Sequence, residues 1–446
     1  MYSLINPSSK TAIITQNDEI TYFSLIDKIA QRKKTFSHFP KNIFVHKADK
    51  TIDFIVDFLA LLELEIPQAV LASDLTQSEC QNQIKQLGQC YSLNNNQSVQ
   101  FHNLDQNQKC DHDTLLILFT SGSSGKSKAV QLSKKNIISN INAIKDSLHF
   151  DKANEQTLFL PLSYSYGLIG QLLTGLYSGI TTRIISNLVE LKSLLEDKKI
   201  NGMLSGVPSH YQALLKLMGK KQYFKISHII SAGAFLPQDL RNRLHIQFPR
   251  SIIFNNYGQT EAGPRILSMN SSQNNFFSNL TGYPVGDLKV KLNEEGELLV
   301  KGDHIMLGYL DDTQDNSKKI SNGWLCTGDL AKIDTKGAIT ILGRKDRLIK
   351  IGGERISPLE IENMISAHPN ITEAIVTFKK DHLYGIKIIC FLSYSSSQKP
   401  TIKEIKSYLK NRLSSKKIPQ TFYFVESIPK NKNGKINLKE IEKIMS

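Results

Sequence analysis

Small hydroxyl-bearing residues, glycines and lysines are concentrated between positions 120 and 128, in the sequence Thr-Ser-Gly-Ser-Ser-Gly-Lys-Ser-Lys. Glycines let backbone N–H groups turn toward a ligand, hydroxyls donate hydrogen bonds and lysines supply positive charge, so this composition suits a cradle for phosphate groups. The apolar run before it, residues 114–119, is typical of a buried strand that would hold the loop in place.

Two other interpretations of this loop have to be weighed. Gly/Ser-rich turns are common after strands, so from this segment alone a plain connecting loop stays open. Its end, Gly125-Lys126-Ser127, also matches the end of the Walker motif G-x-x-x-x-G-K-[ST]. The first glycine of that motif would fall at Thr120, so we do not expect a Walker-type site.

The composition indicates an ordinary globular protein of 446 residues, with 40% hydrophobic and 22% charged residues. This length fits a large domain with a smaller one. We expect no secretory signal and no membrane span, since no apolar run approaches the ~18 residues that a span needs. The five cysteines lack C-x-x-C spacing, which argues against zinc and disulfides and favours a reducing cytoplasm.

The charge balance is basic, with a net charge of +14 and a pI near 9.3. Such a balance fits a nucleic-acid binder, a protein with an acidic partner, or a lysine-rich proteome. The lysines are spread in short groups, without a long basic tail or an RNA-binding signature. We therefore do not expect nucleic-acid binding, and an acidic carrier or cofactor is the better candidate.

The elements that would position the loop follow an alternating pattern. Beyond a helix expected at 134–147, short β-like runs alternate with helical segments, which predicts an α/β domain with buried sheets. Most of these runs end in glycine- or proline-bearing loops, and ligands of open α/β sheets bind at such strand ends. The loops lie at 161–167, 206–208, 232–234 and 257–258. Residues 296–343 change to short strands and turns, and a small α+β unit follows.

Further motifs accompany the loop in a fixed order. They are PLSYSYG at 161–167, NNYGQTE at 255–261, WLCTGD at 324–329, GRKDRLIKIGG at 343–353 and PKNKNGK at 429–435. In this order and at this spacing, they closely resemble the motifs of the adenylate-forming (AMP-binding) enzymes. That superfamily contains acyl- and aryl-CoA synthetases, adenylation domains of nonribosomal peptide synthetases, and luciferases.

The resemblance implies both a fold and a reaction. The fold would be α/β, with a large multi-sheet domain over 1–343 that includes a β-rich subdomain, a hinge at 344–346, and a small mobile α+β domain over 347–446. The reaction would join a carboxylate to the α-phosphate of ATP, release pyrophosphate, and pass the acyl group to a thiol. The implied cofactors are ATP, Mg²⁺, and coenzyme A or the phosphopantetheine of a carrier protein.

The resemblance also implies an ATP site. The loop would wrap the β- and γ-phosphates through Thr120, Ser121, Gly122, Ser123, Ser124, Gly125 and Lys128. Around the nucleoside, Tyr257 would pack its ring on adenine, Asn255 would hydrogen-bond the exocyclic amine of adenine, and Gly233 would flank the same ring. Asp329 would accept hydrogen bonds from the ribose hydroxyls. Arg344 would touch ribose or phosphate, Gly258 and Thr260 would complete the site, and Glu261 would coordinate Mg²⁺.

Catalysis would involve both domains. By resemblance, Lys435 bridges the carboxylate and the phosphate, where a fixed cation gains most as negative charge develops. Asp346 is the expected hinge of a domain rotation that replaces Lys435 by a loop with Gly352 and Gly353, which would line the thiol tunnel. Lys350 is a further candidate for this second half-reaction.

The acyl group is expected near Tyr164, Ser165, His210 and Gly258. Amino-acid-activating members carry an Asp after the aromatic residue of the first loop, whereas here Ser165 or a neighbour takes that place. A buried ammonium without a counter-charge would be costly, so we expect an uncharged fatty or aromatic carboxylate. His210 either lines this pocket or caps a helix, and both options stay open.

Coenzyme A is the expected acceptor, and an acidic acyl carrier protein is the competitor, because the chain stands alone and is basic. A non-catalytic nucleotide-binding protein of the same fold is a further alternative. The presence of Asp329, Arg344, Glu261 and Lys435 argues against it.

Overall fold

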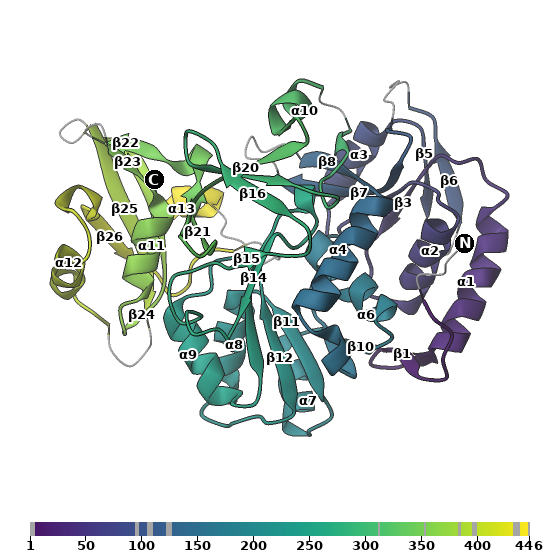
Figure 1. The fold of residues 1–446 in the computed structure, drawn as a ribbon, viewed down its shortest axis with the longest axis horizontal. Helices are drawn as coiled ribbons and strands as arrows, with labels where there is room; N and C mark the ends of the chain where they lie inside the picture. Colours follow the sequence, from purple (N-terminus) through teal and green to yellow (C-terminus); the bar gives the residue numbers. More distant parts are fainter. Residues whose placement is uncertain are drawn as a thin grey trace.

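A computed structural model describes residues 5–93, 98–104, 110–121, 127–310, 313–351, 354–381, 385–394, 399–430 and 438–444. The chain forms a large body of sheets and helices, with a small domain at one end that holds the C-terminal residues (Figure 1). Within these residues, none of the helices is both long and apolar enough to cross a membrane.

A nine-stranded sheet places the loops of the expected site. Its order is β15 (Tyr283–Pro284), β14 (Leu267–Asn270), β13 (Ile252–Tyr257), β12 (Ile226–Ser231), β11 (Gly202–Gly206), β9 (Glu155–Leu158), β10 (Thr181–Ile184), β1 (Thr11–Ile14) and β2 (Glu19–Thr21). The strands from β13 to β1 are parallel, and the outer pairs are antiparallel. The carboxyl ends of β9, β11, β12 and β13 therefore lie at one edge, as the strand-end loops predict.

A seven-stranded sheet carries the hydroxyl- and glycine-rich loop. Its order is β18 (Gly308–Tyr309), β8 (Ser127–Ser133), β7 (Thr114–Ser121), β4 (Gln68–Leu71), β3 (Ile43–Lys47), β5 (Cys90–Leu93) and β6 (Val99–His102). Strands β7 and β8 pair antiparallel up to Ser121 and Ser127, so the two flanks of the loop are held together. Four buried residues in a row, Leu115–Leu118, anchor β7 in the core.

Helices pack on both large sheets. They are α1 (Tyr22–Phe36), α2 (Ile52–Glu63), α3 (Gln77–Leu87), α4 (Lys134–Ser147), α5 (Ser165–Gly167), α6 (Thr174–Tyr177), α7 (Leu188–Glu196), α8 (Pro208–Met218) and α9 (Gln238–Gln247), with a π-helical segment at Leu168–Leu173. The largest core cluster joins α2, α4 and this segment to both sheets. Helix α4 begins after Ser133, whose hydroxyl accepts from the Asn136 N–H as an N-cap.

The expected β-rich subdomain is a five-stranded antiparallel sheet. It contains β16 (Lys289–Leu292), β17 (Glu297–Lys301), β20 (Trp324–Ile333), β19 (Ile320–Ser321) and β21 (Ile339–Arg344). Helix α10 (Thr313–Lys319) leads directly into β19. The motif WLCTGD is therefore the start of β20, beside the end of β21.

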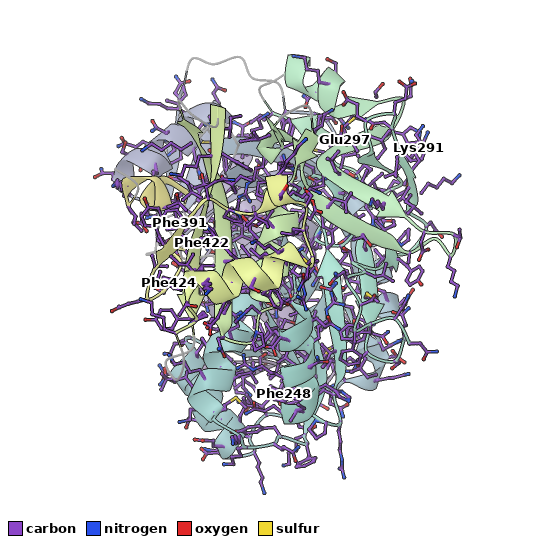
Figure 2. All side chains as sticks on the ribbon, turned by 90° about the vertical axis from the view of Figure 1, so that its left-hand side faces the viewer. Phe248, Lys291, Glu297, Phe391, Phe422 and Phe424 are labelled. Atoms are coloured by element: carbon purple, nitrogen blue, oxygen red, sulfur yellow. The ribbon has the colours of Figure 1, made fainter. Side chains whose placement is uncertain are left out.

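The small domain has a core of its own. Strands β24 (Ile371–Asp381), β25 (Gly385–Tyr394) and β26 (Thr421–Phe424) form its sheet, with α11 (Pro358–Ser366), α12 (Ile402–Lys410), α13 (Leu438–Ile444) and a hairpin of β22 (Ile349–Ile351) and β23 (Glu354–Ile356). Phe391, Phe422 and Phe424 gather on the paired strands β25 and β26 (Figure 2). Residues of α11 and α12 pack with one face of this sheet, and Ile441 of α13 packs with the other. The predicted α/β fold with a small α+β domain is confirmed.

Two local features refine the sequence-based picture. Residues 345–347 form a short turn after β21, so the expected hinge at 344–346 spans the end of that strand and this turn. Helix α3 was not predicted within the polar stretch 73–108, because Leu87 is its single buried residue. The capping box of Thr76 and Glu79 was the signal available for it.

Candidate functional site

The flanks of the loop and Glu261 are linked by Tyr309. Thr120 on β7 faces Lys128 on β8, and the Lys128 ammonium lies 4.7 Å from the centre of the Tyr309 ring. The Tyr309 hydroxyl donates to Oε1 of Glu261 at 2.9 Å. The Lys128 ammonium, the Tyr309 ring and the Glu261 carboxylate therefore form a row along the end of the seven-stranded sheet. This is the region where the phosphates and Mg²⁺ were expected. The side chain of Ser121 and the residues Gly122, Ser123, Ser124 and Gly125 lie outside the described part of the structure.

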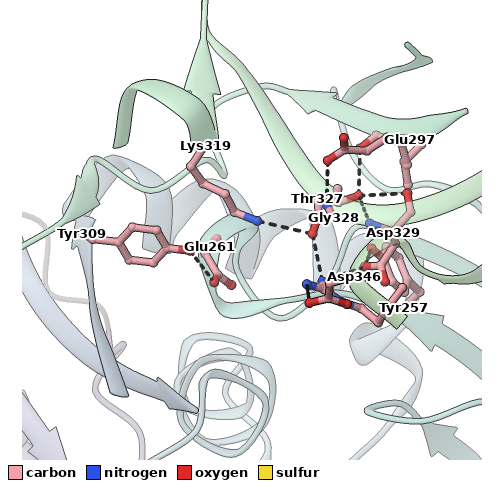
Figure 3. A network of polar contacts seen from close by, with 11 residues as sticks. Tyr257, Glu261, Glu297, Tyr309, Lys319, Thr327, Gly328, Asp329 and Asp346 are labelled. Carbon is pink, nitrogen blue, oxygen red and sulfur yellow. Dashed lines mark hydrogen bonds and ion pairs between the residues drawn. The ribbon is translucent and has the colours of Figure 1, made fainter. Parts of the chain in front are cut away.

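Tyr257, expected at the adenine, and Asp329, expected at the ribose, contact each other. The Tyr257 hydroxyl donates to Oδ2 of Asp329 at 2.6 Å, which joins the end of β13 to β20 (Figure 3). Burial raises the pKa of the Asp329 carboxyl, while the Tyr257 hydrogen bond and the charges of Arg344 and Lys319 oppose that rise. Asp329 is thus a fixed acceptor with cations beside it.

Arg344 connects Asp329 with the expected hinge. Its guanidinium lies 3.8 Å from Oδ2 of Asp329, donates to the Thr327 carbonyl at 3.2 Å, and pairs with Asp346 at 3.2 Å. Gly328 crosses this guanidinium at a φ of +79°, and a Cβ there would lie 2.9 Å from its nitrogens. The glycine of the WLCTGD motif is therefore required by both its conformation and this close approach.

The remaining nucleotide candidates lie at the strand ends. The Asn255 side-chain amide, near the carboxyl end of β13, donates to the Thr281 carbonyl at 3.0 Å. Gly233 follows β12 at a φ of +82°. Gly258 packs so closely that a Cβ would lie 2.3 Å from the Pro264 carbonyl oxygen. Thr260 and Ser165 place their hydroxyl oxygens 3.1 Å apart, which ties the acyl-side loop to the Glu261 turn.

His210 lies at the expected acyl site and also caps a helix. The Val207 N–H donates to its Nδ1 at 3.4 Å at the start of α8, and its ring meets Phe159 edge-on with centroids 4.7 Å apart. Burial, with help from Lys430 and Lys50, lowers the pKa of His210 to about 4. The ring is therefore neutral near pH 7. Tyr164 is half-buried in the same loop as Ser165.

Lys319 belongs to this network and was missed by the sequence analysis. Its ammonium donates to the Thr327 carbonyl at 3.3 Å, and it lies between Glu261 and Asp329 (Figure 3). Burial lowers its pKa, whereas the charge of Glu261 raises it. As one of two lysines in the last turn of a short helix, it resembled a surface residue. The signal for it was the place of α10, which leads through the short strand β19 into the WLCTGD strand β20.

The small domain faces this site across a cleft. A cavity of about 510 Å³ is lined by Ala234, Asp329 and Arg344 from one side and by Glu362 and Lys430 from the other. The Gln212 amide donates to the Thr372 carbonyl across the same boundary at 3.2 Å. Lys430, the last described residue before the Lys435 motif ends, therefore lies at the cleft.

The remaining small-domain candidates are only partly described. Lys435, Gly352 and Gly353 lie outside the described residues. Lys350 is placed by its backbone pairing with Arg355 in the β22–β23 hairpin. Asp346 lies in the turn after β21, paired with Arg344.

Two sheets present their loops to a shared site, and the small domain lies across the cleft from it. The chain belongs to the AMP-binding enzyme family, whose model matches residues 40–310. The model of the AMP-binding enzyme C-terminal domain matches residues 360–435.

Curated relatives include CoA ligases. The 4-coumarate–CoA ligase CCL1 of Humulus lupulus is 30% identical over 347 residues, which are 73% of this chain and 63% of that protein. The oxalate–CoA ligase of Arabidopsis thaliana is 28% identical over 341 residues, 73% of this chain and 66% of that protein. The aligned part thus spans less than two thirds of each relative.

Solved structures share the fold over nearly the whole chain. ATP-bound MatB from Rhodopseudomonas palustris has a TM-score of 0.83 at 21% identity and covers 98% of this chain and 96% of its own. The o-succinylbenzoate CoA synthetase (MenE) from Bacillus subtilis, in complex with its acyl-adenylate, has a TM-score of 0.81 at 22% identity, with 97% and 95% covered.

Proposed function

We propose that this protein is an ATP-dependent acid–thiol ligase. It forms an acyl-adenylate from a carboxylic acid and ATP, and then transfers the acyl group to a thiol with release of AMP. Coenzyme A is the proposed acceptor, because the curated relatives include CoA ligases. The observation that carries the proposal is the Tyr257–Asp329–Arg344 network beside the Lys128–Tyr309–Glu261 row, at one set of strand ends.

The donor set of this site fits the chemistry of MgATP. Asp329 supplies a fixed acceptor for ribose hydroxyls, and Lys128 and Lys319 supply charge for phosphate oxygens. Glu261 offers a hard oxygen ligand that suits Mg²⁺, which would neutralise charge on the triphosphate when bound. In the part of the chain that the structure describes, no group of three or more His, Cys, Asp or Glu side chains could hold a metal. Glu261 would therefore share the ion with phosphate oxygens and water.

Lys435 is the proposed catalytic lysine of the first half-reaction. Attack of the carboxylate on the α-phosphorus concentrates negative charge, and a fixed ammonium stabilises that charge most in the transition state. The place of Lys430 supports this role, because Lys430 lines the cleft and lies close enough to affect the pKa of His210. Residues 1–343 would form the ATP and acyl domain, and residues 347–446 would deliver Lys435.

A rotation of the small domain about Asp346 would serve the second half-reaction. Gly352 and Gly353 would then approach the thiol, with Lys350 from the same hairpin. The turn at residues 345–347 supports the placement of this hinge, since it is the connection after the last strand of the large domain. We place the activity in the cytoplasm, where ATP and coenzyme A are present.

ATP–pyrophosphate exchange with a panel of carboxylic acids tests the proposal. Exchange that depends on one class of acid is expected, and exchange with no acid in the panel would reject the ligase function. The same acids are then offered with coenzyme A or with a carrier protein that bears phosphopantetheine. The net charge of +14 keeps an acidic carrier as the competing acceptor. Thioester found only on the carrier would replace coenzyme A in the proposal.

A further inference from the structure

Arg265 is a buried cation with no carboxylate partner in the part of the chain that the structure describes. Its side chain is 1% exposed, just before β14. One guanidinium nitrogen, Nη1, donates to the carbonyl of the neighbouring Pro264 at 2.8 Å. Its Nε and Nη2 atoms have no hydrogen-bond partner among the described residues. An uncompensated buried charge of this kind is strongly destabilising, so the fold does not explain its presence.

Arg241 shows how this chain satisfies a buried arginine that has a structural role. Its side chain is fully buried as well, and its guanidinium donates to the carbonyls of Leu236, Phe276, Ser278 and Leu280. Three different nitrogens are used in these bonds. Arg265, at the same burial, uses one. The difference indicates that the open N–H groups of Arg265 serve a ligand.

The position of Arg265 identifies that ligand's site. Its guanidinium carbon lies 4.1 Å from the centre of the Tyr166 ring, in the loop that also holds Tyr164 and Ser165. The Tyr166 hydroxyl donates to the Ile230 carbonyl at 2.9 Å, near the end of β12. The backbone of Pro264 and Arg265 packs under Gly258. Arg265 is therefore enclosed by the segments where the acyl group is expected.

Charge and geometry then define the chemistry of the acyl group. The ring of Tyr166 stabilises the cation through its face, but the Tyr166 hydroxyl is a neutral group, since burial raises its pKa, and it supplies no counter-charge. A carboxylate matches the fork of a guanidinium with two parallel hydrogen bonds. Among the described residues, no carboxylate forms an ion pair with Arg265, and a carboxylate on the ligand would supply the missing anion.

We propose that the substrate is a dicarboxylic acid, with one carboxylate activated at ATP and the other held by Arg265. This inference rests on the proposed ligase function and names its substrate class. It reverses the sequence-based expectation of an uncharged acid, which considered the loop at 161–167 and not Arg265.

Matched acids of equal length test the inference in ATP–pyrophosphate exchange. The pairs are succinate with butanoate, adipate with hexanoate, and terephthalate with 4-methylbenzoate. The wild-type protein is expected to prefer the diacid of at least one pair. Arg265→Met should lower the ratio of kcat/KM for diacid over monoacid about 10²-fold, with Arg265→Lys in between. The ratio cancels any general loss of active protein.

The stability of the ligand-free protein separates this role from a structural one. Arg265→Met should be at least as stable as the wild type in urea, because it removes an uncompensated charge. Arg241→Met, the control, should be clearly less stable, because it leaves carbonyls without donors. A destabilised Arg265→Met with an unchanged ratio would show a structural arginine and overturn the inference.

Exchange assays with the wild-type protein alone distinguish a failure of the dicarboxylate inference from a failure of the proposed ligase function. Exchange with monoacids and with none of the diacids would overturn the dicarboxylate inference and leave the ligase function standing. Exchange with no acid at all would overturn the ligase function, and the inference with it.

Discussion

Replacement of Lys319 by methionine is expected to weaken the binding of ATP far more than the binding of adenosine. The Lys319 ammonium lies between Glu261 and Asp329, so a triphosphate that runs from Asp329, the proposed ribose acceptor, toward Glu261, the proposed Mg²⁺ ligand, would pass it. Methionine keeps much of the length and apolar contact of the lysine stem and removes the charge.

The magnitude follows from the partial burial of this ammonium. Two unit charges about 4 Å apart interact by about 4 kcal/mol at an effective dielectric of about 20, which is an upper bound. Mg²⁺ neutralises part of the phosphate charge, and the lysine gives up some of its contact with the Thr327 carbonyl. A net loss of about 1.5–3 kcal/mol is expected, as for other hydrogen bonds to charged groups. The Kd for MgATP should therefore rise about 10- to 100-fold.

Isothermal titration with MgATP, AMP and adenosine measures this difference directly. AMP should be affected less than MgATP, and adenosine hardly at all. Lys318→Met is the matched control, because Lys318 is exposed in the same helical turn and should leave all three Kd values unchanged. Equal weakening of MgATP and adenosine, or an effect of Lys318→Met as large as that of Lys319→Met, would refute the placement of Lys319 at the phosphates.

Other predictions address the remaining parts of the site and the core. Asp329→Asn should weaken adenosine binding about tenfold or more, since it removes a charged acceptor, and a 2′,3′-dideoxy analogue should be insensitive to the change. Lys435→Ala should abolish ATP–pyrophosphate exchange and spare transfer to the thiol from a supplied acyl-adenylate, which single-turnover assays distinguish. Asp346→Pro should leave exchange and block thioester formation; normal thioester output would rule out the hinge. Burial lowers the pKa of His46 and His228 to about 4, so the unfolded chain binds protons first as the pH falls. Each histidine should make the free energy of unfolding fall by about 3 kcal/mol, from its full value above pH ~6.5 to a lower one near pH 4. Urea titrations of His228→Phe should show a shallower fall of this free energy with pH than titrations of the wild type.

Local patterns in the sequence predicted the frame of the site well. Helix α4 spans Lys134–Ser147 as expected, because an apolar period and the capping Ser133 lie within the same stretch. The run before the loop is strand β7, since its residues are apolar and follow one another without interruption. The strand-end loops converge because parallel strands place their carboxyl ends at one edge. The helix and the strand depend on neighbours within one element, and the convergence of the loops follows from the alternating α/β pattern.

The contacts that complete the site depend on residues far apart in the chain. Tyr309 reaches Glu261 over 48 positions, and Tyr257 reaches Asp329 over 72. A tyrosine before a helix carries no local sign of such a partner, so nothing in the sequence singles out Tyr309. Tyr257 and Asp329 were found through motifs, and the hydrogen bond between them was not foreseen.

Lys319 and Arg265 were missed by the sequence analysis for the same physical reason. That reason also predicts how ligands change the stability of the protein. Charged residues are usually solvated, so a sequence offers no ground to bury them. In the fold both are partly or fully desolvated, and burial lowers the pKa of each. One lies at the proposed phosphate end of the reaction and the other at the proposed distal end of the acid. Anions bound at these two places would offset the cost of desolvation, and so each ligand should stabilise the native state by mass action. ATP and a diacid should therefore raise the unfolding temperature together. In Arg265→Met the contribution of the diacid should disappear while that of ATP remains.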